Sequence, residues 1–278
     1  MIVPILSAVT ALTEVAASRE LLWNLTLREL RGKYKRSALG WSWSLVNPLV
    51  TMALFTVVFG VFLRAQPGRG DPSGLDVFAL WLLCGLLPWN FLASTLNGGA
   101  TALVGNSNLI KKVWFPRETL VGAVTGANLV TLLIELGVLT AAVTVAGNRT
   151  APLWLPMVAL VTALLVVFVL GVALALSVLN VYFRDTQHFL AIALQVWFYA
   201  SPVVYPAGYV EGHVPGAVFD AYQANPFALF AETYRDLLYD LRWPPPGALA
   251  LLAAYAAVSL VGGWLVFRRL AGRLAEEL

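Results

Sequence analysis

The residues best able to carry out chemistry in this chain are few. There is one cysteine, Cys84, within an apolar stretch, and there are two histidines, His188 and His213. The histidines lack partners for nucleophilic catalysis, and these three residues cannot form a disulfide framework or a metal cluster. The sequence also contains no G-x-x-x-x-G-K-[ST] phosphate loop. We therefore expect neither an enzyme nor a chain that binds ATP, a metal or another cofactor by itself.

Glu135 is a candidate of another kind, because it stands in the middle of a long apolar stretch. A carboxylate at membrane depth is costly and is by default a functional residue. A proton relay needs further ionisable groups, and the other predicted spans offer none. We expect Glu135 to form a hydrogen bond between helices. It follows Gly122-Ala-Val-Thr-Gly126, a small-xxx-small pattern that permits close helix contact.

The composition indicates a membrane protein. Hydrophobic residues make up 59% of the chain, charged residues make up 12%, and the mean hydropathy is +0.77. A soluble domain typically has about twice that charged fraction. The first strongly apolar stretch follows roughly forty residues rich in Arg and Lys, which is too long and too basic for a secretory leader, so we expect the N-terminus to be retained.

Six segments come close to the roughly 20 apolar residues that a helix needs to cross a bilayer. They are Trp43–Leu63, Val77–Leu96, Thr119–Ala146, Leu153–Val181, Phe189–Tyr205 and Ala248–Phe267. Pro202 and Pro206 predict an early end to the fifth span. The sequence thus predicts a single all-α domain over residues 1–278, with an interface-helix region at 1–42, a six-helix membrane region at 43–267 and a tail at 268–278.

Basic residues predict the orientation. Thirteen of the 18 Lys and Arg residues fall in the N-terminal region, the 97–118 and 182–188 loops and the C-terminal tail. Because basic loops stay on the cytoplasmic side during insertion, both ends of the chain are predicted to be cytoplasmic.

The region from Arg19 to Arg36 predicts an amphipathic helix on the membrane surface. Its apolar face consists of Trp23, Leu27, Leu30 and Tyr34. The rest of the helix is basic, with Arg28, Arg31, Lys33, Lys35 and Arg36. Such a helix can bind anionic lipid headgroups, either as an anchor or as a handle for an anionic substrate.

A second short helix is predicted in the inner loop between the second and third spans. Asn106 or Asn108 is placed to cap it, and Pro116 ends it before the next span. Its apolar side is formed by Leu109, Ile110, Val113 and Trp114. Such a helix suits either a groove in a partner protein or a second interfacial anchor.

The outer segment Pro206–Gly247 contains a third predicted helix. Asn225 is placed to cap it and Pro226 to occupy its first position. Its apolar face consists of Phe227, Phe230, Tyr234, Leu238 and Leu241. At about sixteen residues it is too short to cross the bilayer, so we expect it to dip into or lie along the outer leaflet, as a roof over the spans or as a shield.

Aromatic residues are abundant, and most are expected at the two membrane interfaces. A minority are candidates for lining a path on which sugar rings slide along flat ring faces. These candidates are Trp89, Phe91, Trp197, Phe198 and Tyr199.

Four motifs carry a resemblance to a known family. They are LRELRGKYKRSALGWSWSLVNP at Leu27–Pro48, the Asn106–Pro116 loop, NVYFRD at Asn180–Asp185 and Asn225-Pro-Phe. The chain resembles, over nearly its whole length, the permease subunits of ABC-2 type polysaccharide exporters, which include O-antigen, teichoic acid and mycobacterial galactan exporters.

The resemblance implies a six-span permease that pairs with a second copy of itself and with two cytoplasmic ATP-binding cassette subunits, which hold ATP and Mg²⁺. It implies a bacterial cytoplasmic membrane, a glycan on polyprenyl diphosphate as substrate, and no nucleic acid. It further implies an interface helix at Arg19–Arg36 and an ATPase-coupling helix with Asn106, Leu109, Ile110, Lys111, Lys112, Val113, Trp114 and Phe115. The implied outer gate contains Asn225, Phe227, Phe230 and Tyr234.

We hypothesise that four cations attract the diphosphate headgroup at the entrance, because a compact dianion favours nearby cations. These are Lys33, Lys35, Arg36 and Arg184.

Two other classes of transporter share some of these features. An ABC-2 exporter of drugs or small lipids would have the same architecture. An ion-coupled secondary transporter would need a mid-membrane ion site and often internal repeats, and the sequence shows no repeat between its halves and one acid, Glu135, within the predicted spans.

Overall fold

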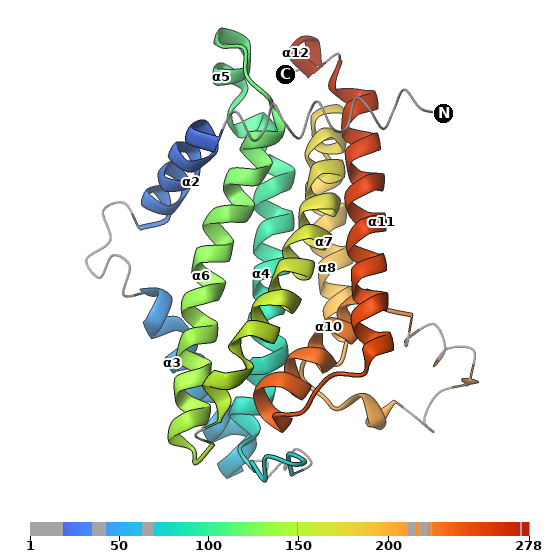
Figure 1. Ribbon diagram of the computed structural model, residues 1–278. Coiled ribbons are helices and arrows are strands. Elements are labelled where there is room, and N and C mark those ends of the chain that lie inside the picture. The colour runs from blue at the N-terminus through green and yellow to red at the C-terminus, as the bar shows by residue number, and fades with distance from the viewer. Residues whose placement is uncertain are drawn as a thin grey trace.

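The computed structural model describes residues 19–34, 43–62, 69–148, 150–210, 215, 216, 219, 222, 224–272 and 274–277. All regular structure in these ranges is helical (Figure 1). The principal helices are α2 (Arg19–Tyr34), α3 (Trp43–Phe55), α4 (Phe78–Gly105), α5 (Ser107–Lys112), α6 (Glu118–Val145), α7 (Leu155–Tyr182), α8 (Thr186–Tyr199), α10 (Pro226–Arg235), α11 (Pro246–Ala271) and α12 (Leu274–Glu277). Shorter turns are η2 (Thr56–Phe62), η3 (Ala151–Trp154), η4 (Ala207–Tyr209) and η5 (Asp236–Asp240).

Four of these elements are long and apolar enough to cross a membrane. They are α4, α6, η3 together with α7, and α11. Two further predicted spans correspond to α3 with the π-helical η2, and to α8, which has 14 residues. The chain leaves α8 at Tyr199, so the early end predicted from Pro202 is confirmed.

Helix α4 is the central helix and is longer than the sequence suggested. The span predicted to end at Leu96 continues to Gly105, so the predicted loop from residue 97 is wrong over its first nine residues. Small residues explain the difference. A Cβ at Gly98 would lie 2.8 Å from Val124 of α6, and one at Gly99 would lie 2.9 Å from Ala173 of α7. This close packing stabilises a stretch whose glycines are poor helix formers in isolation.

Helices α7 and α11 lie along each other through two glycines. A Cβ at Gly171 would collide with the backbone at Ser259, and one at Gly263 would collide with the carbonyl oxygen of Gly171. Nearby, the Ser259 hydroxyl donates a 2.6 Å hydrogen bond to the Phe168 carbonyl. The absence of side chains at both glycines lets the two backbones meet directly.

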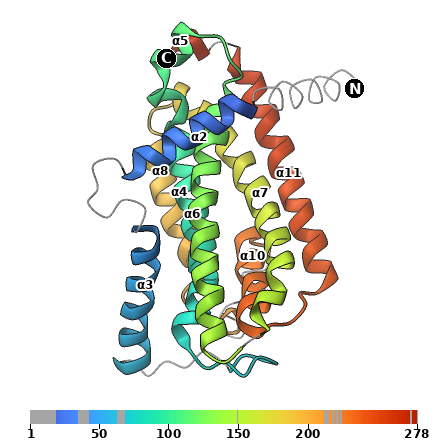
Figure 2. The ribbon, with the colours of Figure 1, turned by 60° about the vertical axis from the view of Figure 1, so that its left-hand side comes forward.

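Helix α2 crosses α6 near its start, and it packs there on the predicted small-residue pattern (Figure 2). A Cβ at Gly122 would lie 3.1 Å from Leu22, and one at Gly126 would lie 3.1 Å from the Thr26 hydroxyl. The close contact predicted for these glycines is confirmed, and its partner is α2.

The residues predicted to form one apolar face of α2 for the headgroup zone are divided between two surroundings. Leu30 is buried against the bundle, together with Leu25, whereas Trp23 is 61% exposed. The side chain of Tyr34 lies outside the described residues. The helix turns Leu22, Leu25 and Leu30 toward the bundle because α6 offers glycines there, which periodicity within α2 alone cannot reveal.

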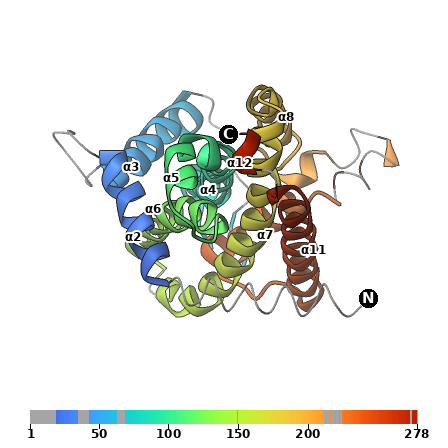
Figure 3. The same ribbon diagram turned by 90° about the horizontal axis from the view of Figure 1, so that it is seen from above.

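The bundle has two differently built ends (Figure 1), and Figure 3 looks down on the end that holds α5 and α12. One end holds α5, the α7–α8 turn, the end of α11 and α12. The other end holds the 69–77 loop, η3, and α10 with η5. The predicted inner and outer loops therefore separate to opposite ends of the molecule.

Candidate functional site

The coupling segment, which we define as Asn106–Arg117, projects from one end of the bundle. Asn106 occupies the cap position of α5, and its carbonyl accepts from the amides of Leu109 and Ile110. Its side chain does not cap the helix. The Asn106 side-chain NH₂ instead donates 2.8 Å to the Ala102 carbonyl at the end of α4.

The apolar side predicted for this segment does not exist as a helix face. Helix α5 ends at Lys112, and Val113 is in extended conformation, so Val113 and Trp114 lie beyond the helix. Ile110 and Phe115 are buried and hold the segment on the bundle, whereas Trp114 is 86% exposed. Lys111 and Lys112 are also exposed. The segment thus presents one large aromatic ring and two cations outward.

Each end of the coupling segment is hydrogen-bonded to a different helix. At its start, Arg28 Nη2 of α2 donates 2.8 Å to Asn106 Oδ1. At its end, Arg117 Nη1 donates 2.7 Å to the carbonyl of Ala271, at the end of α11. Tyr182, within the NVYFRD motif, adds a 2.8 Å bond to the Leu270 carbonyl. A displacement of the coupling segment would therefore strain or break its hydrogen bonds to both α2 and α11.

A groove of about 650 Å³ lies beside the contact between Arg28 and Asn106, between α2, α4 and α6. Its charged lining residues are Arg28, Glu29 and Lys33, all from α2. The remainder consists of small or polar residues, with the short hydrophobic side chains of Val104 and Val124. These are Ser94, Gly98, Thr101, Ala102, Val104, Gly105, Asn106, Val124 and Asn128.

Lys33 is anchored in this groove by a chain of polar contacts across three helices. Its ammonium donates 2.7 Å to Asn128 Oδ1 of α6, whose Nδ2 in turn donates 3.1 Å to the Thr95 hydroxyl of α4. Burial lowers the pKa of Lys33, and the charge of the Glu135 carboxylate partly offsets this effect. Glu135 is buried, and no hydrogen bond from it to another described residue is present, so the hydrogen bond predicted for it stays a prediction.

The four proposed headgroup cations are not all brought together. Lys33 lines the groove, and Arg184 is exposed on the turn between α7 and α8, outside the groove lining. Lys35 and Arg36 lie outside the described residues. The structure adds Arg28, which sequence reasoning counted only as part of a basic face. The available signal was its position five residues before Lys33, with Glu29 between them.

At the opposite end, the predicted outer helix is present as α10 continued by η5. Asn225 Oδ1 accepts from the Phe227 amide at 3.0 Å and from Trp197 Nε1 at 2.8 Å, so the predicted cap is confirmed. The predicted apolar face is buried at every position, from Phe227 to Leu241. The face covers the bundle, mainly against α4.

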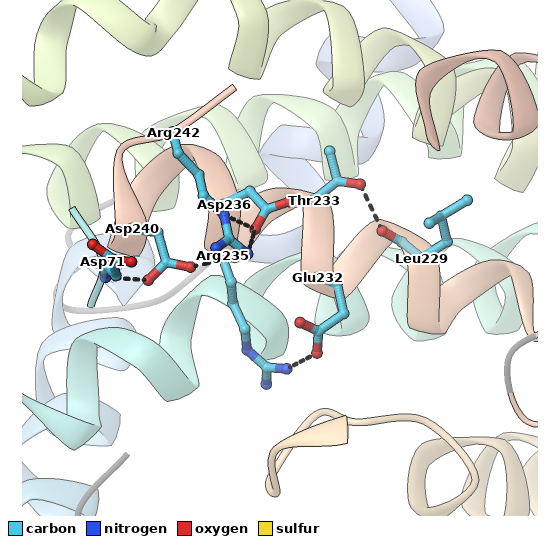
Figure 4. Close-up of polar contacts among 8 residues, drawn as sticks. All are labelled: Asp71, Leu229, Glu232, Thr233, Arg235, Asp236, Asp240 and Arg242. Atoms are coloured by element: carbon cyan, nitrogen blue, oxygen red, sulfur yellow. Dashed lines mark hydrogen bonds and ion pairs between the residues drawn. The ribbon is translucent and has the colours of Figure 1, made fainter. Parts of the chain in front are cut away.

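Charged residues attach this outer element to the 69–77 loop (Figure 4). Arg242 forms 2.8 and 2.6 Å hydrogen bonds to Asp236, and the amide of Asp71 donates 3.3 Å to Asp240. Burial raises the pKa of both Asp236 and Asp240, which Arg242 opposes. The Tyr239 hydroxyl adds a 2.9 Å bond to the Leu75 carbonyl, so loop and helix form one outer layer.

Arg235 is a buried cation that sequence reasoning did not single out. Its guanidinium lies 3.7 Å above the Trp81 ring of α4 and donates to the Val203 carbonyl and Glu232. The side chain is 3% exposed. In the sequence, the one feature that points to burial of Arg235 is its position directly after Tyr234 of the apolar face. That position does not reveal that α4 covers the charge.

Most of the aromatic residues proposed for a path pack within the protomer. Trp89 and Phe91 are buried, and the Trp89 ring contacts the rings of Trp197, Phe198 and Phe227. Tyr199 is exposed. In this arrangement Trp89 packs against Phe227 of α10, and Tyr199, at the end of α8, is the proposed path residue with an exposed ring.

Comparison with known proteins agrees with this architecture. A family model described as ABC-2 type transporter matches residues 20–239. The chain is 29% identical over 269 residues to the O-antigen export system permease protein RfbA of Myxococcus xanthus, covering 95% of this chain and 98% of that protein. A protein of the same name from Klebsiella pneumoniae is 26% identical, with 93% and 95% covered. The polysialic acid transport protein KpsM of Escherichia coli is 24% identical, with 88% and 91% covered.

Proposed function

The chain belongs to the ABC-2 type transporter family, and on that basis we propose that it is the membrane permease subunit of an ATP-driven exporter of a polysaccharide carried on polyprenyl diphosphate. The observation that carries this proposal is the end-to-end similarity to permeases named for O-antigen and polysialic acid export. The chain itself is a transporter subunit rather than an enzyme, and ATP and Mg²⁺ bind to a separate partner.

The working unit consists of two copies of this chain and two cytoplasmic ATP-binding cassette subunits. In each copy α3 with η2 provides the first span and α8 provides the fifth, which completes six spans. Both helices carry exposed apolar residues, which a second copy or lipid would cover. On α3 and η2 these include Leu49, Val50, Leu54, Val57, Val61 and Phe62, and on α8 they include Phe189, Ile192, Val196 and Tyr199.

The end that carries the coupling segment faces the cytoplasm of a bacterial cell, and both chain ends lie on that side. Closure of the ATPase subunits on ATP moves the coupling segment, with Trp114 and the two lysines seated in a partner groove. The exposure of Trp114 supports this role, because a large aromatic ring in a pocket is a common anchor of protein interfaces.

The coupling motion then opens a route for the glycan while the lipid tail stays in the bilayer. Lys33, Lys35, Arg36 and Arg184 attract the diphosphate at the entrance. The aromatic residues near α8 line part of the route, and Asn225, Phe227, Phe230 and Tyr234 belong to the outer gate. The attachment of α10 to the 69–77 loop supports movement of the gate as one unit.

Orientation can be measured with a pair of single cysteines. Asn108→Cys and Asp76→Cys are exposed positions at opposite ends of the bundle, and native Cys84 is fully buried. In intact spheroplasts an impermeant maleimide should label Asp76→Cys, and it should label Asn108→Cys only after permeabilisation. The reverse pattern would contradict the proposed topology.

The function is tested with the purified permease–ATPase complex in proteoliposomes. We expect ATP hydrolysis to be stimulated by a polyprenyl-diphosphate-linked glycan and not by small amphiphilic drugs. Stimulation by drugs alone would identify a drug exporter instead. Transport driven by an ion gradient without the ATPase subunit would contradict the proposal altogether.

A further inference from the structure

We propose that the groove between α2, α4 and α6 is a binding site within one protomer for the diphosphate headgroup of the lipid-linked substrate, with Arg28 as its principal ligand. This inference rests on the proposed function. It assigns the headgroup to one groove, whereas the four entrance cations are not all brought together in the structure. The groove volume of about 650 Å³ lies within the range typical of small-ligand sites.

The cations of the groove are arranged for an anion. Arg28 uses only Nη2 for its contacts with Glu29 and Asn106, and within the described residues its Nε and Nη1 have no hydrogen-bond partner. A bidentate contact with a phosphate pairs Nη2 with either Nε or Nη1, so a phosphate would use one of these two groups together with Nη2 and would displace Glu29 or Asn106 from Nη2. Lys33, held by Asn128, contributes a second cation from the next turn of the same helix.

The walls opposite these cations leave room for a ligand. Ser94, Gly98, Thr101 and Gly105 follow one another along α4 at intervals of three or four residues, so they share a face. A Cβ built at Gly105 meets no atom within 4 Å. A larger side chain at Gly105 would therefore fit without a backbone clash and would occupy the groove. The groove is open here because residue 105 is a glycine.

Among the described residues, the acid in the groove lining is Glu29, and it forms a 2.9 Å ion pair with Arg28. The two side chains are 47% and 35% exposed, so water screens this pair and a doubly charged phosphate group can compete with it. Glu29 therefore acts as a weak internal competitor for the anion. Its removal should strengthen binding, an effect opposite to that of removing Arg28.

The position of Arg28 links the occupied groove to the coupling segment. The same Nη2 that would turn toward a phosphate now holds Asn106, where α4 passes into α5. An anion that recruits Arg28 weakens this contact and frees the start of the coupling segment from α2. The permease would then signal the presence of a headgroup at the surface that meets the ATPase.

Binding of farnesyl diphosphate to the purified full-length permease in detergent tests the site, with farnesol and inorganic pyrophosphate as separate probes. We expect Arg28→Gln and Lys33→Gln each to weaken farnesyl diphosphate binding by roughly tenfold, the loss expected for one charge-assisted contact. Gly105→Leu should weaken it at least as much by filling the groove, and Glu29→Gln should strengthen it several-fold.

The controls use equivalent changes outside the groove. Arg31→Gln removes an exposed cation of the same helix, and Gly262→Leu adds the same side chain where a Cβ also meets nothing; neither should alter binding. Each variant must keep the thermal midpoint of the unaltered protein.

Wild-type affinity in both Arg28→Gln and Gly105→Leu would overturn the site, as would equal affinity for farnesol. Binding of pyrophosphate but not of farnesyl diphosphate would also overturn it, because the site would then serve a free anion. In all three cases glycan-stimulated ATP hydrolysis by the intact complex would remain, so the proposed function would stand while the groove assignment failed.

Discussion

Replacing Gly263 with Ala should destabilise the protein, whereas the same change at the neighbouring Gly262 should not. At Gly263 the new Cβ would overlap the Gly171 carbonyl oxygen and lie within 3.0 Å of its Cα. At Gly262 it meets no atom within 4 Å. The two substitutions are chemically identical and one residue apart, so their difference isolates the contact between α7 and α11.

The size of the effect follows from how far the helices must separate. An ordinary Cβ contact is 3.4–4 Å, and the atoms in the way are backbone atoms of α7 that cannot rotate aside. α11 must therefore retreat by roughly 1.5–2 Å, which forfeits at least about half of the dispersion energy of each atom pair in the contact, itself about 0.1–0.2 kcal/mol per pair. Over several dozen pairs this amounts to about 2–4 kcal/mol, in line with other overpacked sites.

Gly262→Ala gains helix propensity instead, by up to about 1 kcal/mol. Thermal unfolding of the purified variants in detergent, followed by tryptophan fluorescence, should therefore show a lower midpoint for Gly263→Ala and an equal or higher one for Gly262→Ala. Equal midpoints, or a higher one for Gly263→Ala, would refute direct backbone contact between α7 and α11 at this level.

Three further outcomes are expected. Arg235→Lys should lower the thermal midpoint more than Arg235→Met. Lys keeps a buried charge but loses the stacking of the planar guanidinium on Trp81 and its paired hydrogen bonds, which costs about 3–5 kcal/mol of stability, whereas Met removes the charge as well. A lower midpoint for Arg235→Met would show that the cation itself stabilises the fold. Asn225→Ala should cost about 1–2 kcal/mol of stability through the lost α10 cap, and an unchanged midpoint would contradict the capping role. Trp114→Ala should abolish glycan export while basal ATP hydrolysis persists, whereas Trp243→Ala, an exposed tryptophan at the other end, should export normally; wild-type export by Trp114→Ala would dismiss the coupling role.

The outer helix could be predicted in detail because its signals are local. Asn225 and Pro226 specify a start, and the spacing from Phe227 to Leu241 specifies a face. Each signal acts within one or two helical turns, and the burial of every predicted face residue agrees with it. The same reasoning identified Gly122 and Gly126 as a contact site, because small residues at that spacing permit close approach whatever the partner.

Features that depend on the partner of a helix could not be predicted. Periodicity in α2 grouped Trp23 and Leu30 on one face for the membrane surface, but Leu30 packs on the bundle, and that contact is decided by glycines about a hundred residues later in α6. The end of α4 was missed because Gly98 and Gly99 reduce hydropathy and helix propensity, and only packing on α6 and α7 compensates. The burial of Arg235 could not be predicted, because it depends on Trp81 of α4, about 150 residues earlier in the chain.

The two contacts at the ends of the coupling segment have unequal consequences. Arg117 reaches a main-chain carbonyl of α11, which is fixed along α7 by direct backbone contact, so this contact joins the segment to the rigid part of the bundle. Arg28 donates to the side-chain amide oxygen of Asn106. Arg28 belongs to α2, which packs on α6 through Leu22 and Thr26 and borders the groove. A force applied to the segment by an ATPase subunit would thus act on a rigid attachment at Arg117 and on a more easily broken contact between Arg28 and Asn106. Such a force should therefore break the contact between Arg28 and Asn106 first, next to the residues that we assign to the headgroup.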